Sequence, residues 1–270
     1  MGNYDDLAIQ IVNRYMKNRY NLTTEELDYY IKNILINYNN IKETIIDGIS
    51  FQFYDSIISR TVDLVSAEIN AGREYDFKNF DFKKGDCVID IGGNIGMVSI
   101  YLAKKYPFLK IYAFEPVRQN YKNFKANIEL NKIPSGTIIL ENKAVTKDAR
   151  IVNMSINALN TGGSSISDVV SVGAITQDIN CNIKSTTLEK IIKQHKIKTL
   201  KLLKIDCEGS EYEILYNTPK NILQNIQSLR GEFHENKNLT DNYDIDKLYA
   251  YIQQYINDIK IVAARSCFIM

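Results

Sequence analysis

The sequence predicts an α/β domain with a mainly parallel sheet and helices on both faces, preceded by an N-terminal helical appendage. Three observations lead to this prediction. From about residue 84 onward, short apolar segments alternate with amphipathic ones, which is the pattern of strands joined by crossover helices. A glycine-rich turn follows the first apolar segment, and acidic residues stand where several of these segments end. Ligands bind beyond the carboxyl ends of strands in such sheets, so these residues are candidates for a binding site.

The N-terminal part of the chain is expected to be helical. Residues 4–47 have the apolar spacing of two or three amphipathic helices, and Thr24 begins the pattern of a capped helix start. Residues 50–80 are polar and aromatic, and we expect them to connect these helices to the sheet. The chain is therefore divided into residues 1–80, which would contact the substrate or a second copy, and a cofactor-binding domain over residues 81–270.

Strands and helices then alternate to the end of the chain. The expected strands are residues 87–91, 110–114, 137–145, 199–205, 227–233 and 258–269, and the expected helices are residues 95–106, 117–131, 187–195, 209–216 and 244–256. Two further segments, 150–157 and 178–185, are expected to pair as a β-hairpin. Residues 158–174 between them are rich in Gly, Ser and Asn, which is typical of a lid over a binding site or of an exposed loop tip.

The turn after the first expected strand has the composition of a nucleotide-binding loop. Asp90 ends the strand, and Gly92 and Gly96 lie in the turn that leads into the next helix. Glycine lets the backbone bend sharply and approach a ligand closely, and the amides of a helix N-terminus face such a turn. Glu115 ends the second strand, 25 residues after Asp90, where an acid can bind the two hydroxyls of a ribose. The pattern predicts a cofactor that contains adenosine.

Two cofactors compete for this turn. A nicotinamide site requires glycine at the first, third and sixth positions, so that a pyrophosphate fits. These positions hold Gly92, Asn94 and Met97. S-adenosylmethionine has a ribose and an adenine but no phosphate, and the Asn94 amide could bond its amino-acid end. The turn therefore favours S-adenosylmethionine over NAD.

A second group of polar residues follows two later strands. Asp206 and Glu208 follow the strand expected at residues 199–205, and Glu232 and His234 alternate onto one face at the end of the next strand. Because the carboxyl ends of parallel strands meet at one edge, we expect these residues to converge beside the cofactor. An acid at the end of a buried strand needs a partner, and a histidine beside an acid is a candidate for proton transfer.

Composition excludes some classes of function. The 33 basic and 32 acidic residues nearly balance, which disfavours nucleic acid as the main partner. The four cysteines lack the CxxC spacing of a zinc site and indicate reduced thiols in a cytoplasmic protein. The sequence has neither a secretory signal pattern nor an apolar run long enough to span a bilayer. We expect a cytoplasmic protein, with a homodimer as one option.

Over about residues 88–235, the chain resembles the FkbM family of S-adenosylmethionine-dependent methyltransferases. The resemblance rests on the motifs Asp90-Ile-Gly-Gly-Asn-Ile-Gly96, Phe114-Glu115-Pro116, Asn142-Lys-Ala-Val145, Lys204-Ile-Asp-Cys-Glu-Gly-Ser-Glu211 and Glu232-Phe-His234. It implies a Rossmann-like class I methyltransferase fold, with cofactor contacts from Asp90, Gly92, Asn94, Gly96, Glu115 and Ala144. It also implies O-methylation of a carbohydrate or small-molecule acceptor, at a hydroxyl on a sugar, glycan or nucleotide-linked, or on a natural product.

Two mechanisms remain open for the second group, with the metal-free one slightly favoured. In the first, Asp206 or His234 is the general base that takes the hydroxyl proton, with Glu232 beside them. In the second, Asp206, Glu232 and His234 bind a divalent ion that acidifies the hydroxyl. The alternative functions are N-methylation of a small molecule, which needs no strong base, and a cofactor-binding scaffold without catalysis.

Overall fold

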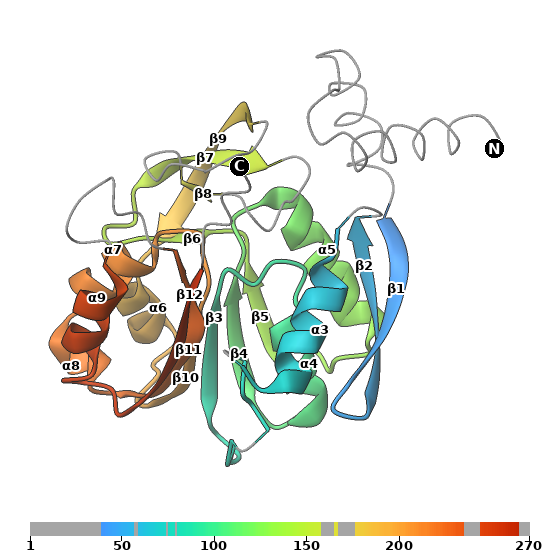
Figure 1. The fold of residues 1–270 in the computed structure, drawn as a ribbon, viewed down its shortest axis with the longest axis horizontal. Helices are drawn as coiled ribbons and strands as arrows, with labels where there is room; N and C mark the ends of the chain where they lie inside the picture. The colour runs from blue at the N-terminus through green and yellow to red at the C-terminus, as the bar shows by residue number, and fades with distance from the viewer. Residues whose placement is uncertain are drawn as a thin grey trace.

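A six-stranded, all-parallel sheet forms the centre of the molecule in the computed structural model, which describes residues 39–56, 59–73, 75–78, 80–157, 165–166, 176–234 and 244–264 (Figure 1). Its strands are β3 (Cys87–Ile91), β4 (Lys110–Phe114), β5 (Ile138–Glu141), β10 (Leu200–Ile205), β11 (Ile226–His234) and β12 (Asp258–Ala264). They lie in the order β12-β11-β10-β3-β4-β5, and every neighbouring pair is parallel. This is the order of a doubly wound Rossmann-like sheet, so the predicted fold class is confirmed.

Helices cover both faces of this sheet, as predicted. On one face lie α3 (Thr61–Ala71), α4 (Met97–Lys105) and α5 (Arg118–Leu130), and on the other lie α6 (Leu188–Gln194), α7 (Glu211–Asn217), α8 (Lys220–Leu223) and α9 (Ile245–Ile252) (Figure 1). Side chains alternate along a strand. In β4, Ile111 and Ala113 therefore enter one core while Tyr112 and Phe114 enter the other. Burial on both faces explains why these strands are apolar throughout.

Residues 39–56 form a β-hairpin, which corrects the helix and the connection predicted there. β1 (Asn39–Ile46) pairs antiparallel with β2 (Ile49–Ser56) across a turn at Asp47 and Gly48, where φ is 53° and 76°. An Asp-Gly pair between alternating apolar residues is a strong signal for a two-residue hairpin turn, and it overrides the helical spacing. Alternate residues Phe51 and Phe53 are fully buried in the same core as α4. Residues 1–38, and the helices predicted in them, lie outside the described residues.

The strand predicted over residues 137–145 is also broken. β5 ends at Glu141, because the Asn142 side-chain amide turns to donate hydrogen bonds to the carbonyl oxygens of Glu115 and Pro116, at 2.8 and 2.9 Å. The chain then enters a small four-stranded sheet, drawn at the top of Figure 1, that contains β6 (Ala144–Val145), β7 (Ile151–Asn157), β8 (Ser165–Ile166) and β9 (Thr176–Thr186). β7 and β9 pair antiparallel, which confirms the predicted hairpin. Apart from β8, the loop predicted as a lid lies outside the described residues.

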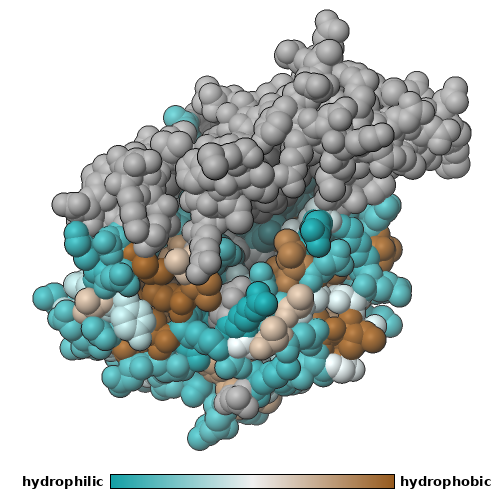
Figure 2. All heavy atoms as spheres, viewed as in Figure 1, coloured by the Kyte–Doolittle hydropathy of each residue, from teal (hydrophilic) through white to brown (hydrophobic). Residues whose placement is uncertain are grey.

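The surface of the described residues contains both hydrophilic and hydrophobic side chains. On the face shown in Figure 2, hydrophilic residues cover most of the described surface, and hydrophobic ones gather in separate patches. None of the helices in the described ranges has the length and apolar character that crossing a membrane requires. The carboxyl ends of the parallel strands lie at one edge of the large sheet, next to the small sheet. The predicted site residues can meet at this edge.

Candidate functional site

A cavity of about 200 Å³ lies where the described strands β3, β4, β10 and β11 end, between α3 and the small sheet. Six of the predicted site residues line it, namely Gly92, Asn94, Glu115, Ala144, Asp206 and Glu232. The structure thus brings together residues that are up to 140 positions apart in the sequence. The other three predicted residues, Asp90, Gly96 and His234, lie around the cavity without lining it.

The two glycines of the turn are required for different reasons. Gly92 has φ at +77°, and a Cβ there would lie 1.7 Å from the carbonyl oxygen of Asp206. The turn and the end of β10 are therefore too close for any side chain at this position. Gly96, with φ at +94°, begins α4, and a Cβ there would lie 2.2 Å from the ring of Phe124. Gly96 shapes the turn from behind and does not face the cavity.

Asp90 is buried beside the cavity and does not line it. It accepts a hydrogen bond from Ser99 Oγ at 2.6 Å and pairs with Lys204 Nζ at 3.2 Å. Burial alone would lower the pKa of Lys204, but the charges of Asp90 and Asp206 raise it above its ordinary value. The charged Lys204 also donates to the carbonyl oxygen of Gly92 at 2.6 Å. Lys204 therefore connects β10 to the glycine turn, through its ion pair with Asp90 and its hydrogen bond to Gly92.

Glu115 and Asn94 present acceptor atoms at the cavity. The Glu115 carboxylate accepts backbone N–H groups from Asn94 at 2.7 Å and Val117 at 2.8 Å. Burial raises the pKa of Glu115 to about 8, although these two hydrogen bonds act to lower it. Asn94 has φ at 48°, and its buried Oδ1 has no hydrogen-bond partner among the described residues. Asn120 Nδ2 donates to Glu115 Oε1 as well, at 3.4 Å. Each carboxyl oxygen has two lone pairs, so Glu115 and the Asn94 amide oxygen both retain acceptor capacity for a ligand.

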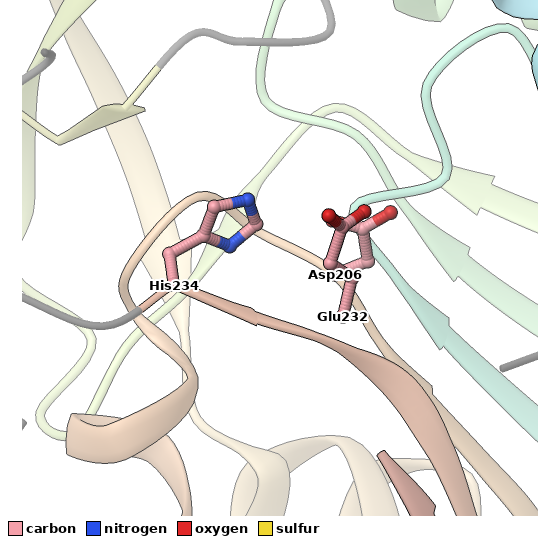
Figure 3. A group of neighbouring side chains, drawn as sticks. All are labelled: Asp206, Glu232 and His234. Carbon is pink, nitrogen blue, oxygen red and sulfur yellow. The ribbon is translucent and has the colours of Figure 1, made fainter. Parts of the chain in front are cut away.

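The second predicted group does converge, as Figure 3 shows for the three labelled side chains. Asp206, Glu232 and His234 each place one polar atom within 4.8 Å of the others. Asp206 Oδ2 accepts a hydrogen bond from the Tyr75 hydroxyl at 2.7 Å and lies 3.9 Å from Lys204 Nζ. The aspartate therefore stands at the wall of the cavity with donors on one of its two oxygens.

His234 is held between two other carboxylates. Its Nε2 lies 3.1 Å from Glu208 Oε2, and its Nδ1 lies 3.1 Å from Glu211 Oε1. Burial would lower the pKa of His234, but the hydrogen bond and charge of Glu211, with the charges of Glu208 and Asp206, raise it to about 10. An imidazolium donates from both nitrogens and has no lone pair left. In this arrangement both ring nitrogens of His234 are engaged by carboxylates.

Sequence reasoning missed two of the contacting residues. Glu211 is fully buried, and its Oε1 also accepts the backbone N–H of Cys207 at 3.0 Å, whereas the sequence pattern is typical of an acid in the first turn of a helix that complements the helix dipole. Tyr75 comes from a segment without regular structure before β3, and nothing in the local pattern marks it. Only the folded chain shows that Tyr75 contacts Asp206 and that Glu211 contacts His234.

The charge of His234 leads to a prediction about stability. Its pKa of about 10 lies above the ordinary value of 6.5, so the protonated ring stabilises the fold fully below about pH 6.5 and progressively less as the pH rises toward 10. We expect the melting temperature of wild type to exceed that of His234→Gln most at pH 6, with the gap narrowing toward pH 9.5. His195→Gln, at the chain's other histidine, is the matched control. A gap that widens with pH would contradict the assignment.

The chain is similar in sequence to known methyltransferases. The model of the methyltransferase FkbM domain matches residues 90–258. Methyltransferase 1 of Beauveria bassiana (strain ARSEF 2860) is 25% identical over 202 residues, which cover 67% of this chain and 80% of the relative. The 31-O-demethyl-FK506 methyltransferase FkbM of Streptomyces tacrolimicus is 26% identical over 192 residues, or 62% and 73% of the two chains.

A solved structure is also similar. It is the methyltransferase FkbM from Methylobacillus flagellatus KT, at 14% identity and a TM-score of 0.44. The match covers 76% of this chain and 50% of that one, so the chain spans about half the length of that protein.

Proposed function

Because the chain belongs to the FkbM family of S-adenosylmethionine-dependent methyltransferases, we propose that it methylates a hydroxyl group of a sugar or natural product, with Asp206 as the general base. One observation carries this proposal. The Asp206 carboxylate lines the same cavity as Glu115 and Asn94, so a proton acceptor stands beside the groups that suit the cofactor. The enzyme class is given by the family, whereas the hydroxyl acceptor and the residue roles are our proposal.

The residues present fit S-adenosylmethionine. Glu115 would accept hydrogen bonds from the two ribose hydroxyls, and the unpartnered Asn94 Oδ1 would accept one from the ammonium group. Gly92 lines the cavity and carries no side chain. Ala144 also lines the cavity, and its side chain is small enough to leave room for a ring. When bound, the cofactor supplies a methyl group that is electrophilic because it is attached to a positively charged sulfur.

The protein must activate and orient the acceptor. An alcohol is a poor nucleophile until its proton leaves, so a base in hydrogen-bond reach of the hydroxyl accelerates the transfer. The proton of the acceptor O–H moves to an Asp206 oxygen as the hydroxyl oxygen is methylated. Both nitrogens of His234 lie 3.1 Å from the carboxylates of Glu208 and Glu211, whereas Asp206 lines the cavity, and we therefore assign the role of base to Asp206. Holding the hydroxyl in line for the transfer supplies much of the remaining rate.

We propose the metal-free form of this mechanism. The candidate atoms of Asp206, Glu232 and His234 lie within 4.8 Å of one another. However, each nitrogen of His234 already lies 3.1 Å from a carboxylate oxygen of Glu208 or Glu211. Binding an ion through one ring nitrogen would require His234 to lose one proton and to give up one of its two carboxylate partners.

The charge of the cavity favours an acceptor without phosphate. Glu68, Asp206, Glu208 and Glu232 line it, while Lys143 is its one lysine or arginine in the described part of the chain and pairs with Glu141 at 2.6 Å. Like charges placed together cost several kcal/mol. A neutral sugar or natural product is thus favoured over a nucleotide-linked sugar. An amine acceptor is the second candidate, because the same carboxylates would attract it.

Binding and transfer assays test this proposal. Calorimetry is expected to detect S-adenosylhomocysteine and not NAD. Labelled methyl transfer is then measured to a panel of methyl glycosides, macrolide aglycones, amino sugars and uridine diphosphate sugars. Transfer to oxygen on a phosphate-free member supports the proposal. Transfer only to nitrogen, or only to the nucleotide sugars, would contradict it.

Glu115 is expected to contribute strongly to cofactor affinity. Glu115→Ala removes the acceptor proposed for the two ribose hydroxyls, and two hydrogen bonds contribute about 1–3 kcal/mol together. The dissociation constant of S-adenosylhomocysteine, measured by calorimetry, should rise by about 5- to 150-fold. Glu141→Ala, at the end of the neighbouring strand and outside the cavity, is the matched control. Equal affinity in wild type and Glu115→Ala would remove this residue from the cofactor site.

A further inference from the structure

Tyr75 reaches the site from outside the part of the chain that the family model matches, which begins at residue 90. The side chain is 3% exposed and lines the cavity. Its hydroxyl donates a hydrogen bond of 2.7 Å to Asp206 Oδ2. A buried phenol therefore contacts the proposed base directly, although neither the motifs nor the family match assigns it any role.

The segment that carries Tyr75 is held by contacts before and after this residue. Gly72 ends α3 in the left-handed conformation, with φ at 64°. Lys260 Nζ, from β12, donates to the Gly72 carbonyl oxygen at 2.7 Å and lies 3.3 Å from Asp76 Oδ2. The ring of Tyr75 also stacks on Phe77, with centroids 6.0 Å apart. These contacts fix where the hydroxyl can point.

The surroundings keep this hydroxyl protonated. Burial raises the pKa of Tyr75 well above its ordinary value, and the charges of Asp206, Glu68 and Glu232 raise it further. The phenol is therefore a permanent donor and cannot take the acceptor's proton itself. Its hydrogen bond occupies Oδ2 of Asp206, which is also the oxygen nearest Lys204 Nζ, at 3.9 Å. Oδ1 is the oxygen left for the acceptor.

We propose that Tyr75 is a positioning residue, which fixes the Asp206 carboxylate so that Oδ1 faces the acceptor hydroxyl. This inference rests on the proposed role of Asp206 as the base. Without the phenol, the carboxylate can rotate about its side-chain bonds, and fewer of its orientations are productive. A small misplacement of a reacting group lowers the rate steeply. The family domain would then depend for its geometry on a residue supplied by the preceding segment.

Tyr75→Phe removes only the hydroxyl and tests the proposal. With a panel acceptor that is methylated, kcat is expected to fall by about 10- to 100-fold, while the affinity for S-adenosylhomocysteine stays within about twofold. In the Asp206→Asn background the same change should have almost no effect on kcat, because Tyr75 acts through Asp206. Tyr101→Phe is the matched control. The Tyr101 hydroxyl on α4 donates a hydrogen bond of 3.2 Å to Asp47 Oδ2, and this residue does not line the cavity.

An acceptor-independent measurement accompanies the kinetics. In full-length protein saturated with S-adenosylhomocysteine and labelled with ¹³C at tyrosine Cζ, the Tyr75 resonance is identified by its loss in Tyr75→Phe. It should move in Asp206→Asn and stay in place in the Asp148→Asn control. An unmoved resonance, or an unchanged kcat for Tyr75→Phe, would overturn the inference. If Asp206→Asn itself retains full kcat, the proposed base is wrong, which is a separate failure.

Discussion

Asp206→Asn is expected to lower kcat by about a hundred- to ten-thousandfold, the usual cost of losing a general base. Asparagine keeps the size of the side chain and can still accept the bond from the Tyr75 hydroxyl, but its amide cannot take a proton at neutral pH. The affinity for S-adenosylhomocysteine should remain within about twofold, because the ribose and amino-acid contacts proposed for Glu115 and Asn94 are untouched. Turnover with the panel acceptors and calorimetry measure the two quantities separately.

The control and the metal alternative are tested in the same assay. Asp148→Asn alters an exposed carboxylate that pairs with Arg150 outside the cavity, and it should behave as wild type. Wild-type turnover should also persist after treatment with a chelator. Loss of activity on chelation and recovery with a divalent ion would contradict the metal-free mechanism. Wild-type turnover by Asp206→Asn would place the base elsewhere.

The sheet edge could be predicted because its signals are local. Asp90, Gly92 and Glu115 each occupy a strand end or the turn after it, and the parallel topology then brings strand ends together. Asp206 and Glu232 follow the same rule, and the structure places both at the cavity. A residue that reaches a site through the end of its own strand is thus visible in the sequence.

Residues that reach the site through tertiary packing were not visible. Tyr75 arrives from an irregular segment whose position depends on Lys260, 185 residues later in the chain. His234 lies near Asp206 and Glu232 as predicted from the strand ends, but its charge depends on Glu208 and Glu211, which flank it only in the folded chain. In β1 and β2, helical spacing was given more weight than the Asp47-Gly48 turn, so the hairpin was missed. Chemistry that depends on such neighbours requires the structure.

Lys204→Met is expected to destabilise the fold by about 3–5 kcal/mol, the usual cost of leaving a buried charge without its partner. Lys204 and Asp90 have side-chain exposures of 4% and 1% and lie 3.2 Å apart, so removing the ammonium leaves Asp90 ionised in an apolar setting or forces it to bind a proton. The Gly92 carbonyl oxygen would also lose its donor. Urea denaturation should show the lower stability, and calorimetry should show weaker S-adenosylhomocysteine binding.

A second variant separates the charge effect from simple loss of packing. Lys204→Met combined with Asp90→Asn removes both charges, so it should recover part of the lost stability, even if the single variant is too unstable to purify. Binding of S-adenosylhomocysteine should recover less, because the donor to Gly92 is still missing. Lys201→Met, a half-buried lysine on the same strand, is the control and should cost little. If the double variant is no more stable than Lys204→Met, the buried pair does not explain the role of this lysine.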